Sequence, residues 1–210
     1  MKLLNFLLIV FLLCNNIFGE IPEKKKTKPK AKGVKQMELK GKKVVMIIAS
    51  QNFRDEEYLE PKRILSSAGA EIITASSSLS TATGMLGAKV KPDILISDIK
   101  PEDYDAIIFV GGIGSSEYWE NQTAHNIARK AIEKNKIVAA ICIAPVTLAN
   151  SGLLKGKKAT AFPSVKGQIS SKGAKYTGVP VEQDEKIITG IGPESATQFG
   201  EVIKKALMSK

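Results

Sequence analysis

The sequence predicts an α/β protein with an open, doubly wound and mostly parallel sheet that has helices on both faces. The first observation behind this fold class is a series of short, unbroken apolar runs rich in β-branched residues, which are typical of strands buried on both faces. The second is the helical spacing of apolar residues between some of these runs. Strands that alternate with helices favour right-handed crossovers and therefore parallel pairing.

The predicted elements follow one another along a single domain. Strands are predicted at residues 44–48, 72–74, 106–110, 137–141 and 187–189. Helices are predicted over residues 122–134 and 194–208, and two more are expected to begin near Pro61 and Pro145, because proline is favoured in the first turn of a helix. Residues 76–99 interrupt the alternation and contain two glycines and a proline, so we expect a small hairpin there.

Composition supports one globular domain and places the basic charge outside it. A chain of 210 residues with 43 % hydrophobic and 25 % charged residues is unlike a disordered or disulfide-stapled chain. The net charge is +10, but residues 1–43 hold 11 basic and 3 acidic side chains, whereas residues 44–210 hold 20 basic and 18 acidic ones. The nearly neutral domain therefore gives no reason to expect nucleic-acid binding.

The N-terminal region predicts export. Residues 1–19 hold one lysine and a short apolar block, which is typical of a signal peptide cleaved near Gly19, and we expect a periplasmic or secreted protein. The alternative is an uncleaved anchor. Residues 20–42 are rich in lysine and are predicted to be a flexible linker, with at most weak contact to an anionic surface. The predicted domain covers residues 43–210.

Cys142 is the candidate nucleophile. It follows the strand at 137–141 and precedes the helix expected at Pro145, so its side chain should project from a sharp strand-to-helix turn. We expect the start of that helix to lower the pKa of the thiol. The alternative is an inert buried cysteine. If Cys14 leaves with the signal peptide, Cys142 is the single cysteine of the mature chain.

Two other segments should meet Cys142 at the carboxyl ends of the strands, where ligands bind in this architecture. One is an acidic loop at residues 53–57, in which Glu57 is expected to be buried, to have a raised pKa and to shuttle protons. Asp55 and Glu56 are expected to be solvated. The other is the Gly111-Gly112 pair, and the N–H groups of Gly112 and Ile143 could act as oxyanion donors. We predict no metal site.

The ordered set of motifs resembles the ThiJ/PfpI family. The matching stretches, which span about residues 43–208, are F-x-D-x-E-x-x-x-P at 53–61, FVGG at 109–112, AAICxAP at 139–145, GLLKG at 152–156 and GIGP at 190–193. The resemblance implies a flavodoxin-like fold related to class I glutamine amidotransferases, a homodimer and no added cofactor. It also implies that Cys142 is the nucleophile, Glu57 its carboxyl partner, and Gly112 and Ile143 the backbone donors.

Departures from the family pattern shape the functional hypothesis. Ile143 stands where many members have histidine, and Phe162 stands where others have the histidine of a His-Pro pair. We expect Phe162 and Gly111 to line the pocket. His125, the only histidine, is expected to be a surface or helix-cap residue, which disfavours a cysteine peptidase. We expect a glyoxalase or deglycase type of reaction on a small carbonyl compound such as methylglyoxal or glyoxal. The alternative is a redox-sensing or protective protein in which Cys142 is reversibly oxidised.

Overall fold

The structure is a computed structural model that describes residues 38–209. The predicted signal peptide, its cleavage site near Gly19 and most of the predicted linker lie outside the described residues. The last residues of the predicted linker belong to the folded domain instead. Leu39 is fully buried, its N–H donates to the carbonyl of Ala68 at 2.9 Å, and Glu38 pairs with Lys204 at 2.6 Å. The folded part therefore reaches back at least to Glu38, because one apolar side chain in this basic segment packs into the core.

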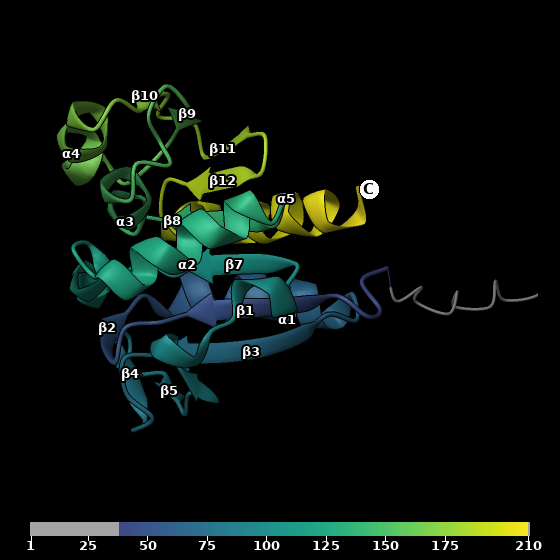
Figure 1. The fold of residues 1–210 in the computed structure, drawn as a ribbon. Coiled ribbons are helices and arrows are strands. Elements are labelled where there is room, and N and C mark those ends of the chain that lie inside the picture. The colour runs from purple at the N-terminus through teal and green to yellow at the C-terminus, as the bar shows by residue number, and fades with distance from the viewer. Residues whose placement is uncertain (1–37, 210) are drawn as a thin grey trace, which may run out of the picture. The chain divides into compact units, whose positions relative to one another are not determined.

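A seven-stranded, mostly parallel sheet forms the centre of the molecule, as predicted (Figure 1). Its strands, in spatial order, are β11 (Val181–Asp184), β12 (Ile187–Gly190), β8 (Ile137–Ile141), β7 (Ala106–Phe109), β1 (Lys43–Ile47), β3 (Glu71–Ser76) and β6 (Ile94–Leu95). Within this sheet, the pair formed by β11 and β12 is antiparallel and all other pairs are parallel. The registers place Val45 beside Ile107 and Ile107 beside Val138, so the central strands are aligned with one another.

Helices cover both faces of this sheet. They are α1 (Asp55–Ser67), α2 (Gln122–Glu133), α3 (Pro145–Asn150) and α5 (Ala196–Met208), whereas α4 (Lys166–Ser171) lies against α3 and β10 (Lys175–Tyr176) (Figure 1). Successive strand residues point to opposite faces, so Val44 and Met46 pack with residues of α1 and α5, whereas Val45 and Ile47 pack with residues of α2 and α3. This arrangement confirms the predicted doubly wound α/β fold. No helix within residues 38–209 is long and apolar enough to cross a membrane.

Short strands build two small sheets beside the main one. One contains β2 (Gln51–Phe53), β4 (Ala82–Gly84) and β5 (Lys89–Val90), and the other pairs β9 (Lys158–Ala159) with β10 (Lys175–Tyr176). β4 and β5 pair antiparallel, so the hairpin expected within residues 76–99 is present. That segment also contains β6, which joins the main sheet.

The start of α1 differs from the prediction. Pro61 was expected to open the helix, but α1 begins at Asp55, and Pro61 lies inside it. Three acidic residues occupy the first turn of α1, where side-chain negative charge is favoured by the free N–H groups and the helix dipole. The segment at 55–57 is therefore helical rather than a loop, which fixes the direction of the Glu57 side chain.

Candidate active site

Cys142 lies on a sharp turn between β8 and α3. Its φ is +63°, in the left-handed region that residues other than glycine rarely adopt. The strained backbone is held on both sides, because the Cys142 N–H donates to the carbonyl of Gly190 at 2.9 Å and the Cys142 carbonyl accepts from the N–H of Phe162 at 2.8 Å. Strain of this kind persists where surrounding contacts define the backbone, and it is concentrated at functional sites.

The Gly111-Gly112 pair lies directly against Cys142. A Cβ atom on Gly111 would be 2.6 Å from the Cβ of Cys142 and would also overlap a carboxyl oxygen of Glu57. Gly112 has φ +95°, and a Cβ atom there would overlap the backbone of Arg54. Both positions therefore require glycine, since the backbone approaches its neighbours too closely to leave room for a side chain.

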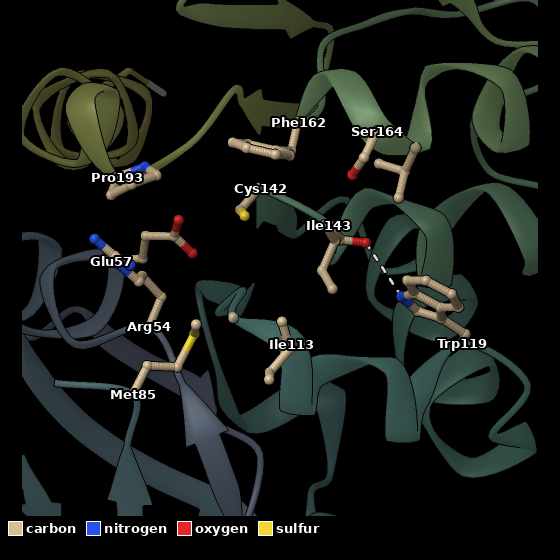
Figure 2. A pocket seen from close by; sticks show the side chains of 12 residues that line it. Arg54, Glu57, Met85, Ile113, Trp119, Cys142, Ile143, Phe162, Ser164 and Pro193 are labelled. Carbon is tan, nitrogen blue, oxygen red and sulfur yellow. Dashed lines mark hydrogen bonds between the residues drawn. The ribbon is translucent and has the colours of Figure 1, made fainter. Parts of the chain in front are cut away.

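Glu57 projects from the first turn of α1 toward the thiol of Cys142. Its side chain is fully buried, and neither carboxyl oxygen has a hydrogen-bond partner among the residues that the structure describes. Figure 2 shows the carboxyl group facing the region of the Cys142 sulfur. A buried carboxyl group without a partner is costly when ionised, so it favours its protonated form.

The two groups titrate as a pair. Burial, the dominant cause, raises the pKa of Glu57 to about 8, against the opposing effects of Cys142 and Arg54. Burial and the charge of Glu57 raise the pKa of Cys142 to about 12, against hydrogen bonds from the N–H groups of Gly112 and Ile143. The pair therefore loses its first proton near pH 8, and the negative charge lies mainly on the Glu57 carboxylate, because the pKa of the Cys142 thiol is the higher of the two.

The thiol pKa corrects one expectation. We expected the start of α3 to lower the pKa of Cys142, but this helix has only six residues, and burial outweighs it. The sulfur still has two backbone donors, because the N–H groups of Gly112 and Ile143 point to it. These are the two groups that the sequence pattern suggested as oxyanion donors.

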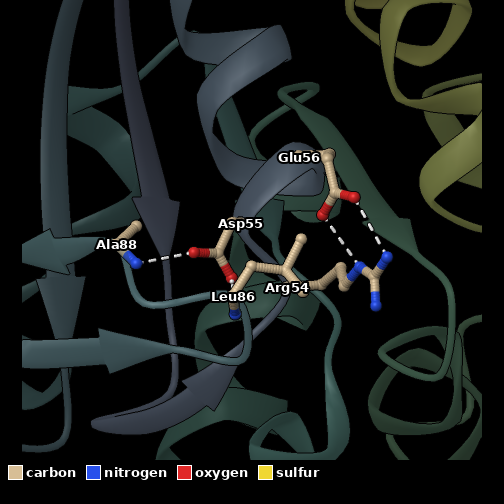
Figure 3. Close-up of polar contacts among 5 residues, drawn as sticks. All are labelled: Arg54, Asp55, Glu56, Leu86 and Ala88. Carbon is tan, nitrogen blue, oxygen red and sulfur yellow. Dashed lines mark hydrogen bonds and ion pairs between the residues drawn. The ribbon is translucent and has the colours of Figure 1, made fainter.

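Arg54 and Asp55 have roles that the sequence did not indicate (Figure 3). Asp55, which was expected to be solvated, is only 5 % exposed, and its carboxylate accepts from the N–H groups of Leu86 and Ala88 at 2.8 and 2.7 Å. It thereby fixes the turn of the β4–β5 hairpin. Glu56 is partly exposed and accepts two hydrogen bonds from the guanidinium of Arg54, at 2.8 and 3.0 Å.

Cys142 and Glu57 open into a cavity of about 280 Å³. The other lining residues are Arg54, Met85, Gly112, Ile113, Trp119, Ile143, Phe162, Ser164, Val165 and Pro193. The structure thus brings together Cys142, Glu57, Gly112, Ile143 and Phe162, with Gly111 packed behind the first two. Sequence reasoning missed most of the apolar lining, because a single Met or Ile carries no recognisable motif. Trp119, the only tryptophan in the chain, was the one available signal.

His125 is not part of the cavity lining. It is 3 % exposed within α2 rather than on the surface, and its Nε2 is hydrogen bonded to the carbonyl of Trp119 at 2.8 Å. The indole Nε1 of Trp119 donates in turn to the carbonyl of Ile143 at 3.2 Å, as Figure 2 shows. His125 therefore supports the pocket wall. Within residues 38–209, no three His, Cys, Asp or Glu side chains gather in an arrangement that could hold a metal ion.

The fold and the site define a class of doubly wound α/β proteins that carry a cysteine on the turn after a central strand, beside a buried glutamate. The chain belongs to the DJ-1/PfpI family, whose sequence model matches residues 42–206. This finding confirms the resemblance to ThiJ/PfpI proteins noted in the sequence.

Individual relatives agree with the family assignment. The chain is 41 % identical over 176 residues to the uncharacterized protein MJ0967 of Methanocaldococcus jannaschii, covering 82 % of this chain and 86 % of that protein. It is 33 % identical to the deglycase PH1704 of Pyrococcus horikoshii, with 67 % and 84 % covered. The crystal structure of a ThiJ/PfpI domain protein from Brachyspira murdochii superposes with a TM-score of 0.79 at 31 % identity, over 81 % of this chain and 99 % of that one.

Proposed function

We propose that this protein is a cofactor-independent enzyme that converts small 2-oxoaldehydes, such as methylglyoxal or glyoxal, into 2-hydroxy acids. The observation that carries the proposal is the buried Glu57 carboxyl group, which lacks another partner among residues 38–209 and faces the Cys142 sulfur. Similarity to a protein named deglycase supports chemistry on reactive carbonyl compounds.

The first half of the reaction uses the sulfur and the two backbone donors. The Glu57 carboxylate takes the proton of the Cys142 thiol, and the resulting thiolate adds to the aldehyde carbon, so a C–S bond forms and the carbonyl π electrons move to oxygen. The N–H groups of Gly112 and Ile143, which point to the sulfur, are suited to stabilising this oxyanion. Protonated Glu57 then gives its proton to the oxygen, which yields a hemithioacetal and leaves a carboxylate.

The second half uses Glu57 as a base and then as an acid. Its carboxylate removes the proton from the carbon that bears sulfur, and the electrons of that C–H bond form an enediolate whose negative charge lies on the neighbouring oxygen. The hydroxyl proton then moves to that oxygen, and Glu57 returns its proton to the neighbouring carbon, which gives the thioester of a 2-hydroxy acid. Water then cleaves the C–S bond and releases the acid with the free thiol. The net change is addition of one water, so the reaction requires no external oxidant or reductant.

Loss of methylglyoxal followed with purified protein tests the proposal. We expect Cys142→Ser to abolish turnover and Glu57→Gln to lower kcat by about a hundredfold or more, because the proton transfers lose their carrier. Glu60→Gln is the matched control, since Glu60 lies on the same helix but outside the cavity lining. A wild-type rate no faster than that of Cys142→Ser would refute the proposed enzymatic activity.

A second candidate function is a protective or redox-sensing role through reversible oxidation of Cys142. The observation that favours it is the raised pKa of Glu57, because a protonated carboxyl group can donate a hydrogen bond to an oxidised sulfur. Intact mass after mild peroxide treatment tests this role. The addition of one or two oxygen atoms that map to Cys142 is expected, and an unmodified Cys142 that still reacts with aldehydes would exclude it.

We also propose that the protein forms a homodimer and is exported. Family membership supports a homodimer, which sedimentation velocity would detect as twice the chain mass. The apolar block before Gly19 supports export. A cysteine peptidase is disfavoured, because the single histidine of the chain is held by the carbonyl of Trp119 outside the cavity lining.

A further inference from the structure

We propose that the pocket selects 2-oxoaldehydes that carry a branched hydrocarbon substituent over those that carry a methyl or hydroxymethyl group. This inference rests on the proposed aldehyde chemistry and adds the class of substituent. Its basis is the division of the cavity into a reactive end and an apolar wall. Glu57 and Cys142 form the reactive end together with Gly112, which also lines the cavity. Figure 2 shows Met85, Ile113 and Phe162 on the other sides of the Cys142 sulfur.

The apolar wall leaves an unusual amount of hydrophobic surface exposed in one place. Met85, Ile113 and Phe162 are 39 %, 61 % and 39 % exposed, and all three line the same cavity. Large apolar side chains that cluster at the mouth of a pocket are typical of a binding site for an apolar group. A hydrocarbon substituent would remove this surface from water, whereas a hydroxymethyl group would lose its own hydration without gaining a partner.

Charge in the pocket points the same way. Among the described residues, Arg54 is the cationic side chain of the lining. Its Nε and Nη2 groups donate hydrogen bonds to the carboxylate of Glu56. Away from the reactive end, Ser164 is the remaining polar side chain of the lining. In the part of the pocket built by residues 38–209, Arg54 is thus paired with a carboxylate, which weakens its attraction for a substrate bearing a carboxylate or phosphate on its substituent.

The size of the cavity sets the scale of the substituent. A volume of about 280 Å³ lies near the lower end of small-molecule pockets, which run from about 300 to 1,000 Å³. At about 30 Å³ for each water-sized group, this space holds about nine non-hydrogen atoms, which is enough for the two reacting carbons, their oxygens and a substituent of about four carbons.

The hairpin that carries Met85 is fixed before any substrate binds. The Met85 N–H donates to the carbonyl of Phe53 at 2.9 Å, and the next turn residues donate to buried Asp55. A Cβ atom on Gly84 would lie 2.5 Å from the Asp55 carboxylate, so the backbone approaches that group closely. The backbone that carries the Met85 side chain is therefore held at the cavity before binding, which favours selectivity.

Three aldehydes with one reactive centre test the inference: methylglyoxal, 4-methyl-2-oxopentanal and 3-hydroxy-2-oxopropanal. We expect kcat/KM for the isobutyl compound to exceed that for methylglyoxal by about tenfold, and the hydroxymethyl compound to be the poorest. Met85→Ala should reduce the preference for isobutyl about threefold. Met208→Ala is the matched control, because Met208 is 49 % exposed at the end of α5, outside the cavity lining.

A second readout separates this inference from the enzyme proposal. Each aldehyde forms a reversible hemithioacetal with Cys142 and so protects it from iodoacetamide, whether or not turnover follows. The aldehyde concentrations that give half protection should rank the three compounds in the same order as kcat/KM. This order without any turnover would support selection of apolar substituents and refute the proposed enzymatic activity. Equal or reversed preference in both measurements, or a preference that Met85→Ala leaves unchanged, would overturn the inference.

Discussion

Gly111 shows how a single residue permits the candidate chemistry. Its Cα lies where Glu57 and Cys142 meet, and a Cβ atom would be 2.6 Å from both the Cβ of Cys142 and the carbonyl oxygen of Ile141. Because the second of these atoms belongs to the backbone, the conflict cannot be relieved by rotating a side chain.

We therefore expect Gly111→Ala to lower the free energy of unfolding by about 1–3 kcal/mol and to slow alkylation of Cys142. Gly167→Ala is the control, since a Cβ atom on Gly167 would have no neighbour within 4 Å. Thermal denaturation and mass-mapped alkylation give the two readouts. An alanine variant that matched the wild type in both would show that Glu57 and Cys142 can move apart freely.

Glu57 should make stability depend on pH. Its pKa is raised from 4.5 to about 8, so the unfolded chain releases this proton before the folded protein does. The contribution of Glu57 to the free energy of unfolding is fully present at a pH below its pKa in the unfolded chain. It is lost as the pH rises toward about 8, the pKa in the folded protein. At 1.36 kcal/mol per pKa unit, the loss at pH 7 is about 3 kcal/mol.

The Glu57→Gln variant lacks this titration. Its unfolding free energy relative to the wild type should therefore rise by about 3 kcal/mol between pH 4.5 and pH 7. Urea unfolding of both proteins at several pH values measures the difference, and titration of the other carboxylates cancels between them. If the unfolding free energies of the two proteins changed with pH in parallel, Glu57 would be ionised in the folded state at neutral pH.

At the scale of elements, Asp55 joins α1 to the β4–β5 hairpin. Two hydrogen bonds from Leu86 and Ala88 end on one buried carboxylate, and such charge-assisted bonds contribute more than neutral ones. Asp55→Asn keeps the shape but removes the charge and one acceptor. We expect the amides of Leu86 and Ala88 to exchange with solvent about tenfold faster, which corresponds to about 1.4 kcal/mol.

Asp103→Asn, which changes an exposed carboxylate, should leave both amides unaffected. Hydrogen exchange followed by NMR resolves the two positions. Unchanged exchange in Asp55→Asn would show that the strand pairing alone holds the hairpin. If the hairpin does loosen, Met85 should lose its fixed position at the cavity, so the same variant also reports on the pocket wall.

Elements differ in how well their local sequence predicts them. β8 begins and ends at the predicted residues, because an apolar run buried on both faces specifies a central strand by itself. α1 was predicted six residues too late, since a proline in the helix interior was read as a start signal. The glycines and the proline of residues 76–99 indicated the β4–β5 hairpin but not its bounds, and β2, which has only three residues, was not predicted.

At the scale of the whole molecule, topology explains which part of the site could be predicted. The carboxyl ends of β1, β7 and β8 lie together in a parallel sheet, so the segments that follow them meet regardless of their distance in sequence. For that reason the strand pattern alone is enough to predict that Glu57, Gly112 and Cys142 lie close together. Met85 and Trp119 reach the cavity through a hairpin and a loop outside the sheet, and strand order places neither of them.

At the scale of the whole chain, the N-terminal region should direct export. We expect removal of residues 1–19 and a mature protein that begins at Glu20, with Cys142 as its only cysteine. Burial holds the pKa values of Cys142 and Glu57 above neutrality, so little thiolate forms at pH 7 and disulfide exchange should be slow. A lone cysteine could then stay reduced in an oxidising compartment.

Mass spectrometry of the protein from the periplasm or medium tests this expectation. The mature mass, one free thiol per chain and no disulfide-linked dimer are the expected results. Leu8→Arg, which interrupts the apolar block, should instead retain the chain inside the cell with residues 1–19 attached. A wild-type chain found intact in the cytoplasm would refute export, whereas an exported dimer linked through Cys142 would show that burial does not protect the thiol.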